Sequence, residues 1–280
     1  MKLSLDTGRE TLKGKFLTGL RLTSKRLRLA LSGILLAVGV LAPYTLMHGT
    51  ALPPPDEAGR VALMEVAGLY DESSGVSSTF LARLRRQGAS ESEILAVLLL
   101  LAALTAEQQV TRDMCALATG RRRLAGLAHR VKGRTSLARK IESDAQEKQL
   151  SLRAAAWGIS DVLRYTILCP ATSYSEEVPA ILAELTSRGY EVIKLRNAWG
   201  GRFYQGVNVQ LMSPAGVRVE LQLHTPQSYA IKQKSHAVYE IRRDPASTPE
   251  EVAAATQASL DYNALVHVPR GATGIAWGVA

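Results

Sequence analysis

The stretch that decides the fold is Val217–His224, VRVELQLH, in which apolar and polar residues alternate strictly. In a strand this alternation places the apolar side chains on one side. The polar side then carries Arg218, Glu220, Gln222 and His224. Upstream, Val207–Leu211 (VNVQL) repeats the alternation, and Ser213–Gly216 (SPAG) supplies turn residues between the two stretches. The pattern predicts a hairpin with one core face and one face that is either solvent-exposed or a site.

The elements before the hairpin predict an α+β fold. Asp161–Cys169 (DVLRYTILC) is apolar and β-branched after its first residue, which predicts a buried strand. A helix is expected over Ser175–Arg188 because its first residues form a cap and a glycine follows its end. Glu191–Leu195 predicts a further strand, and Arg196–Arg202 a loop rich in Gly and Arg. The order β-α-β-β-β with flanking helices predicts a mixed β-sheet covered by helices.

Helices are expected on both sides of this region. Ser78–Gln87 predicts a short helix, and Ser90–Glu93 (SESE) a capping box that opens a helix through Ile94–Ala106. Tyr229–Arg243 predicts a helix whose basic residues extend a phosphate-binding surface. Ser247–Glu250 (STPE) predicts a second capping box, opening a C-terminal helix to about Leu265.

Composition and charge narrow the class of protein. The chain has 280 residues and is 46% hydrophobic, which excludes a disordered protein. Two cysteines exclude a disulfide framework and a multi-Cys zinc module. The net charge of +9 comes from two blocks: residues 1–28 hold 8 basic and 2 acidic residues, and residues 121–244 hold 20 and 11. Two basic blocks indicate two anionic partners, membrane lipid for the first and phosphates for the second.

The first block precedes a candidate membrane segment. Leu29–Met47 is 19 residues of almost entirely apolar character, about the length that crosses a bilayer as a helix. Basic residues before it predict a cytoplasmic N-terminus and an anchored or exported bacterial protein. A cleaved signal, with Gly49–Ala51 as cleavage site, and a buried core helix are the alternatives. Ile94–Ala106 is interpreted as a buried helix. The alternative, a second membrane pass, would return the rest of the chain to the cytoplasm.

The chain therefore divides into three predicted parts. Residues 1–52 form a basic arm with the membrane or signal segment. Residues 53–117 form a helical spacer that begins with the stiff, proline-rich run Leu52–Glu57. Residues 118–280 form the α+β domain with its C-terminal helix.

The second basic block contains closely spaced Lys and Arg around Gly133 and Ser136. Cations neutralise phosphates, glycine permits a close approach of the backbone, and a hydroxyl adds a hydrogen-bond donor. This combination suits a polyphosphate, although charge alone also fits a solvated basic helix face.

An ordered set of motifs resembles a known family. The set comprises Arg130-x-Lys132-x-x-x-Ser136-x-x-x-Lys140, Asp161, Tyr204 in Phe203-Tyr204-Gln205-Gly206, and Glu220-x-Gln222-x-x-Thr225. Arg130–Arg243 resembles the synthetase domain of RelA/SpoT-like alarmone synthetases, which transfer pyrophosphate from ATP to the 3′-hydroxyl of a nucleotide. The resemblance implies a nucleotidyltransferase-like synthetase fold and a Mg²⁺-dependent transferase.

The resemblance and the chemistry of the side chains assign candidate roles. Glu220, helped by Gln222, would activate the acceptor hydroxyl, and Asp161 with Glu220 would hold magnesium. Five residues would bind the ATP phosphates: Arg130, Lys132, Arg134, Ser136 and Lys140. Four would bind the acceptor, with Tyr204 stacking on its base: Tyr204, Asn208, Lys194 and His224.

Two departures from the family pattern bear on the acceptor. Thr166 stands where the family has an arginine, and Arg164 lies two residues earlier. Asn208 stands where the family usually has a histidine. Both features are similar to a divergent branch of toxins and secreted effectors.

The sequence analysis therefore predicts a growth-inhibiting pyrophosphokinase. ATP is the expected donor, a nucleotide or a tRNA 3′ end the acceptor, and an antitoxin or immunity protein a further partner. The chain has no room for the hydrolase and regulatory domains of long family members. The alternative is a membrane-tethered nucleotide- or RNA-binding module without turnover.

Overall fold

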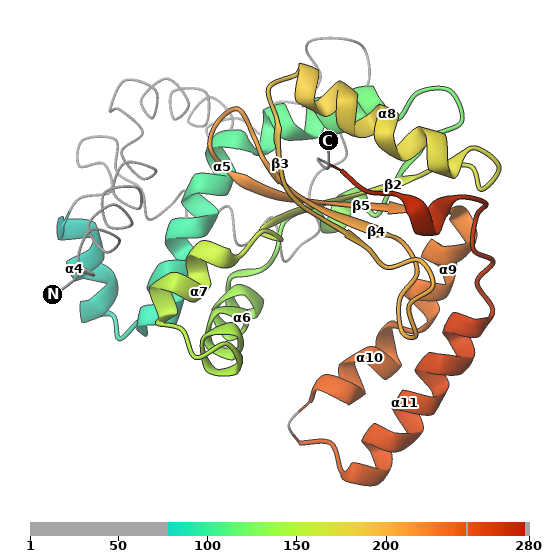
Figure 1. The fold of residues 1–280 in the computed structure, drawn as a ribbon. Helices are drawn as coiled ribbons and strands as arrows, with labels where there is room; N and C mark the ends of the chain where they lie inside the picture. The colour runs from blue at the N-terminus through green and yellow to red at the C-terminus, as the bar shows by residue number, and fades with distance from the viewer. Residues whose placement is uncertain (1–77, 245, 278–280) are drawn as a thin grey trace, which may run out of the picture. The chain divides into compact units, whose positions relative to one another are not determined.

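The computed structural model describes residues 78–244 and 246–277, and these fall into two compact units (Figure 1). Of the described residues, one unit contains 78–105 together with Gly133–Trp157, and the other contains Ala106–Lys132 together with 158–244 and 246–277. The predicted membrane segment Leu29–Met47, the proline-rich run and the boundary after residue 52 lie outside the described residues. The boundary after residue 117 remains a prediction, and the units divide the chain differently.

The first unit is helical. It holds α4 (Ser78–Arg86), α5 (Glu91–Leu117) as far as Thr105, α6 (Arg134–Glu147) and most of α7 (Leu152–Gly158). Its buried apolar side chains include Leu100, Leu137 and Ile141. The Oγ of Ser92 donates to Oε1 of Glu142, which joins α5 to α6.

The helix α5 begins at the predicted capping box. The backbone N–H of Ser90 donates to Oε2 of Glu93 at 2.8 Å, and that of Glu93 donates to Oγ of Ser90 at 3.2 Å. The helix continues to Leu117 instead of ending near Ala106. Within the described part of the chain, it is the one helix long and apolar enough to cross a membrane, a property that core helices of soluble proteins share. Ala96, Leu100 and Ala103 are completely buried, as expected of a core helix.

The second unit contains a five-stranded mixed sheet, which confirms the predicted α+β fold. Its strands are β1 (Arg123–Ala125), β2 (Leu163–Leu168), β3 (Glu191–Asn197), β4 (Val207–Met212) and β5 (Arg218–His224). They are ordered β1-β2-β5-β4-β3, with β2 and β5 parallel and the other pairs antiparallel. The sequence analysis missed β1, which has only three residues.

The predicted alternation divides the sheet into two faces. Val219, Leu221 and Leu223 are completely buried on one face, together with their neighbours on β4 and β2. The helix α8 (Tyr174–Ser187) lies along the sheet in Figure 1, and its apolar side chains are buried as well. Thr111, on the second half of α5, forms a hydrogen bond of 2.7 Å with the hydroxyl of Tyr165 on β2. Burial on this face leaves the polar side chains of β2 to β5 on the other.

The C-terminal helices differ in detail from the prediction. The helix expected over Tyr229–Arg243 is two helices, α9 (Pro226–Lys234) and α10 (His236–Arg243), which meet at Ser235. The final helix, α11 (Pro249–Ala264), is capped by Thr248 with Glu251, one residue later than predicted. The α9 cap at Thr225 was not predicted, and it fixes α9 directly at the end of β5.

Candidate active site

The polar face of the sheet carries two rows of side chains. Strand register aligns one residue from each of β2, β5, β4 and β3 in each row, in that order. The first row is Arg164, Glu220, Gln210 and Lys194. The second row is Thr166, Gln222, Asn208 and Arg196. Three inter-strand steps make each row about 14 Å wide. The sheet thereby brings together four predicted site residues, namely Glu220, Gln222, Asn208 and Lys194.

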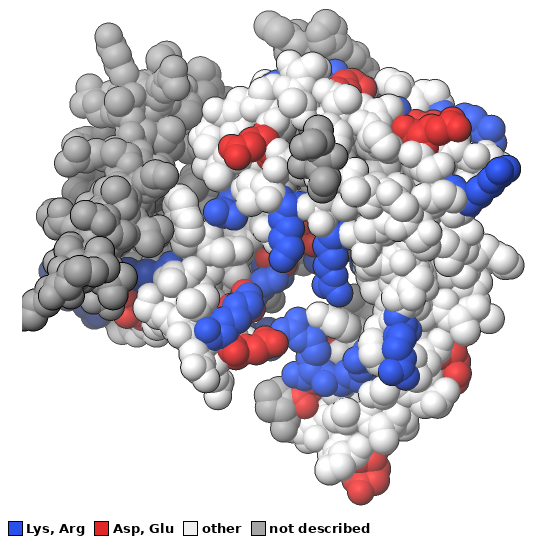
Figure 2. Space-filling model, viewed as in Figure 1, with Lys and Arg blue, Asp and Glu red and all other residues white. Residues whose placement is uncertain are grey.

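The charged groups of these rows lack partners. Within the described residues, the side chains of Glu220, Arg164, Lys194 and Arg196 form no hydrogen bond and no ion pair. Figure 2 shows basic side chains flanking an acidic one above the sheet, and a further basic group over α9 and α10. A half-buried carboxylate among several cations that it does not neutralise is an arrangement suited to an anionic ligand and to proton transfer.

The register also explains the first departure from the family pattern. Residues 164 and 166 lie on the same face of β2, because they are two positions apart. Arg164 is aligned with Glu220, and Thr166 with Gln222. Moving the arginine by two residues therefore keeps it on the polar face and places it beside the predicted base.

Tyr204 is held by a buried hydrogen-bonded cluster at the end of β5. Its hydroxyl donates to Oδ1 of Asn208 at 2.6 Å and lies 2.7 Å from Nε2 of His224. His224 is completely buried, and its Nδ1 lies 3.0 Å from Oγ of Ser228 on α9. A Cβ on Gly206 would lie 2.8 Å from the His224 ring, so glycine is required for this approach. Three predicted acceptor-binding residues thus form one cluster.

The cluster has a consistent proton arrangement. Burial lowers the pKa of His224 to about 3, so the ring is neutral at physiological pH. The Tyr204 hydroxyl donates its one proton to Asn208, so Nε2–H of the neutral His224 ring is the donor to the tyrosine oxygen. Burial also raises the pKa of Tyr204, with Glu220 adding to the effect. His224 therefore positions Tyr204 from beneath and does not reach solvent.

The residues of the predicted phosphate-binding segment are divided between the two units. Lys132 forms an ion pair with Asp161, Nζ to Oδ2 at 2.8 Å, and Asp161 is 8% exposed. Arg130 is completely buried and donates from Nε to Oε1 of Glu107 at 2.6 Å. The geometry favours a structural role for Arg130. Its guanidinium bonds Glu107 on α5, while its backbone oxygen accepts a hydrogen bond from Arg164 on β2.

The other members of that segment lie on α6, in the first unit. Arg134 begins the helix after Gly133, while Ser136 and Lys140 are one turn apart and share a helix face. Ser136 is exposed and Lys140 is half-buried. Their part in ATP binding remains a prediction.

The candidate magnesium ligands are carboxylates, which suit the ion chemically. Asp161 precedes β2 and belongs to neither row, whereas Glu220 lies within β5 in the first row. Among the described residues, no group of three or more His, Cys, Asp or Glu side chains is placed to hold a metal. Magnesium often uses only one or two carboxylates together with substrate phosphates. Asp161 and Glu220 therefore fit an ion that arrives with a nucleotide, and do not form a preformed cage.

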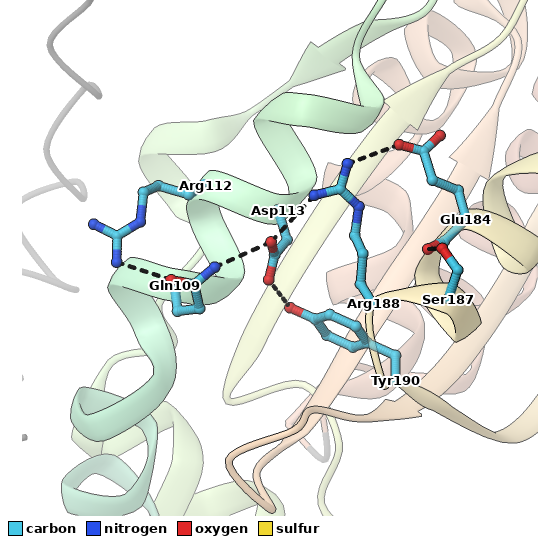
Figure 3. Close-up of polar contacts among 7 residues, drawn as sticks. All are labelled: Gln109, Arg112, Asp113, Glu184, Ser187, Arg188 and Tyr190. Atoms are coloured by element: carbon cyan, nitrogen blue, oxygen red, sulfur yellow. Dashed lines mark hydrogen bonds and ion pairs between the residues drawn. The ribbon is translucent and has the colours of Figure 1, made fainter. Parts of the chain in front are cut away.

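A second cluster of charged side chains is fully partnered and has a structural role. Figure 3 shows Asp113 of α5 between Arg188 and Tyr190, which follow α8. Asp113 accepts from the Tyr190 hydroxyl at 2.8 Å and from Gln109 at 3.1 Å, and forms an ion pair with Arg188 at 3.5 Å. Arg188 also bonds Glu184 at 2.9 Å. In contrast to the sheet face, these charges satisfy one another.

Three residues of the polar face have no predicted site role from the sequence: Arg196, Gln210 and Arg164, the last of which stands only as a departure from the family pattern. Arg196 and Gln210 could have been found, because they continue the alternation of their strands. Lys232 is among the basic residues of Tyr229–Arg243 that are expected to extend a phosphate-binding surface, but its hydrogen bond to Gln222 depends on where α9 packs.

Comparison with known proteins gives similar folds only. No protein-family model and no curated protein matches the chain. Among solved structures, the type VI effector Tas1 in complex with its immunity protein is 21% identical, with a TM-score of 0.38, and the match covers 64% of this chain and 95% of that one. Small alarmone synthetase 1 from Bacillus subtilis, bound to its product pppGpp, is 17% identical, with a TM-score of 0.42 and coverages of 59% and 90%.

A GTP pyrophosphokinase family protein from Streptococcus pneumoniae is also similar, at 14% identity and a TM-score of 0.39, with coverages of 68% and 90%. These similar structures are an effector, an alarmone synthetase and a GTP pyrophosphokinase family protein, the kinds of protein whose motifs this sequence resembles. Because the identities and TM-scores are low, the function is argued from the side chains of the polar face.

Proposed function

We propose that the protein transfers pyrophosphate from ATP to the 3′-hydroxyl of a nucleotide or of an RNA 3′ end. The observation that carries this proposal is the polar face, where the carboxylate of Glu220 lies beside the guanidinium of Arg164 and neither group has an ion-pair partner among the residues that the structure describes. Such a pair supplies a base next to a charge that stabilises phosphate oxygens, which are the two requirements of the transfer.

The residues of the polar face can support the following pyrophosphate transfer. The acceptor 3′-oxygen attacks the β-phosphorus of ATP, and Glu220 takes up the hydroxyl proton. The bond from the β-phosphorus to the oxygen bridging it to the α-phosphate breaks, and AMP leaves with that oxygen. Arg164, Lys194 and Arg196 offset the charge of the phosphates, and Tyr204 provides a ring for the acceptor base.

Magnesium is proposed as the cofactor. Asp161 and Glu220 would hold it together with nucleotide phosphates, and it would supply further neutralisation of phosphate charge. Binding of Mg²⁺ without nucleotide is expected to be weak, since only two carboxylates are offered. Isothermal titration with MgCl₂, alone and with ATP, tests this dependence.

The transfer is tested on the full-length chain in detergent, because α5 contributes contacts to the sheet unit and cannot be removed safely. ATP is mixed with GTP, GDP, ADP or tRNA, and AMP release is measured by chromatography. Glu220→Gln is expected to lower the rate at least 100-fold by removing the base. Glu250→Gln, an exposed residue at the start of α11, is the matched control and should leave the rate unchanged. Absence of AMP with every acceptor contradicts the proposal.

We further propose that this activity inhibits growth and is blocked by a cognate antitoxin or immunity protein. Such transfer, when unregulated, would consume ATP and modify an essential nucleotide or RNA. Induced cytoplasmic expression of the wild-type chain should arrest bacterial growth, whereas Glu220→Gln should not. Equal arrest by both variants would assign the effect to something other than transfer.

The second candidate function is a nucleotide- or RNA-binding module without turnover. The observation that favours it is the excess of cations over carboxylates on the polar face, together with the lack of a three-ligand metal group in the described residues. The two functions separate in one assay. Nucleotide binding that is unchanged by Glu220→Gln and by magnesium, with no AMP formed, would favour the binding module.

A further inference from the structure

One cation reaches the polar face from outside the sheet. Lys232, on α9, donates from Nζ to Oε1 of Gln222 on β5. The side chain is half-buried, and in the described part of the molecule it forms no ion pair. Its hydrogen-bond partner is a neutral amide, and the centre of the Tyr229 ring lies 5.7 Å from its ammonium, so neither contact supplies a negative charge that balances it. A partly buried ammonium without a carboxylate partner is unfavourable unless an anion joins it.

The charges around Lys232 place it in the same region as the proposed base. The pKa of Lys232 is lowered to about 8, chiefly by burial and then by the nearby charge of Arg164, while the charge of Glu220 acts in the opposite direction. Arg164 comes from β2 and Lys232 from α9, so two elements direct cations toward one carboxylate. The mutual repulsion of these cations is not relieved by any ion pair of either group among the residues described. An anionic group between them would relieve it.

We propose that Lys232 and Arg164 together hold a phosphate group of a nucleoside polyphosphate beside Glu220. The ammonium has three donors, of which Gln222 takes one and two remain for phosphate oxygens. Arg164 contributes a planar fork that suits the same group. The proposal names the phosphate contact of the site described under Proposed function and rests on that site, but it does not require turnover.

A structural explanation of Lys232 makes a different prediction. If the residue only joined α9 to β5, its charge would be unnecessary, and a neutral side chain of similar length would bind nucleotides normally. Lys232→Met removes the charge and keeps most of the aliphatic chain. Lys234→Met is the matched control, because Lys234 lies on the same helix, is exposed and forms no side-chain hydrogen bond or ion pair within the described residues. Lys232→Arg keeps the charge.

The experiment measures equilibrium binding of ATP, ADP and adenosine to the full-length chain in detergent, without magnesium or acceptor. Lys232→Met is expected to weaken ATP and ADP binding at least 10-fold while changing adenosine binding less than twofold. Lys234→Met should bind all three as the wild type does, and Lys232→Arg should restore much of the ATP affinity. The slope of log affinity for ATP against log salt should fall for Lys232→Met.

Two outcomes overturn the proposal: unchanged ATP binding by Lys232→Met, or an equal loss for ATP and adenosine in a variant whose thermal unfolding matches the wild type. A different outcome would contradict the proposed function without contradicting the phosphate contact. A chain that binds ATP in a Lys232-dependent manner but releases no AMP with any acceptor would contradict the transfer and retain the phosphate contact.

Discussion

His224 is neutral because it is completely buried, and this makes the protein's stability depend on pH. Its folded-state pKa of about 3 lies below the ordinary value of 6.5, so between these values the unfolded chain binds a proton that the folded chain does not. The contribution to stability is therefore full above about pH 6.5 and decreases as the pH falls, by up to about 1.4 kcal/mol per pH unit.

His224→Gln should abolish this dependence. From about pH 7 to about pH 5.5 the wild type is expected to lose about 1 kcal/mol more than the variant, as measured by urea unfolding. At pH 7 the variant should itself be less stable by about 1–3 kcal/mol, because the Tyr204 hydroxyl loses its donor. If the wild type and His224→Gln lose the same free energy of unfolding over this pH range, His224 is accessible to protons in the folded protein.

Arg130 is the residue at which motif and structure suggest different roles. Removing Glu107 alone should cost about 3–5 kcal/mol, since it leaves a buried guanidinium without its carboxylate. Replacing both, as Glu107→Leu with Arg130→Met, should recover most of that loss. If Arg130 is structural, the double variant binds ATP as the wild type does. If Arg130 contacts ATP, the double variant folds but binds it weakly.

At the scale of elements, α5 joins the sheet unit through polar contacts of its second half. Asp113→Ala should destabilise the protein by about 2–3 kcal/mol, because Tyr190 and Arg188 lose a common buried partner (Figure 3). Arg112→Ala is the control: Arg112 is exposed, and within the described residues its side chain bonds only Gln109, so the change should stay within about 0.5 kcal/mol. Chemical unfolding of both variants measures the difference, and equal effects would contradict the anchoring role.

Several helices and strands could be predicted from short stretches of the sequence. Alternation predicted β4 and β5, a capping box predicted the start of α5, and the glycines after them predicted the ends of α4 and α8, because these signals lie within a few residues of the element. The three-residue β1 has too short a pattern, and the break between α9 and α10 has no Pro or Gly to mark it. The extension of α5 to Leu117 follows from partners on β2 and near α8, which are distant in sequence.

At the scale of the whole molecule, two stretches have the length and apolar character of a membrane span. We predict that Leu29–Met47 and not α5 binds the membrane, because Glu107, Thr111 and Asp113 of α5 contact the sheet unit. Replacing Leu29–Met47 with a polar linker should move the protein from the membrane fraction to the soluble fraction after sedimentation. If the altered chain still sediments with membranes and resists carbonate extraction, α5 is the membrane segment.

The sequence by itself determined the α+β class, the order of the main strands and helices, and the two faces of the β4–β5 hairpin. These depend on side-chain periodicity and on caps, which are local. Only the tertiary structure decided which polar residues act together. The parallel pairing of β2 with β5 sets Arg164 beside Glu220, the packing of α9 brings Lys232 to Gln222, and the fold buries His224 and Arg130 completely. The physical reason is that desolvation and charge pairing depend on neighbours far apart in the chain, and residue order alone does not encode those distances.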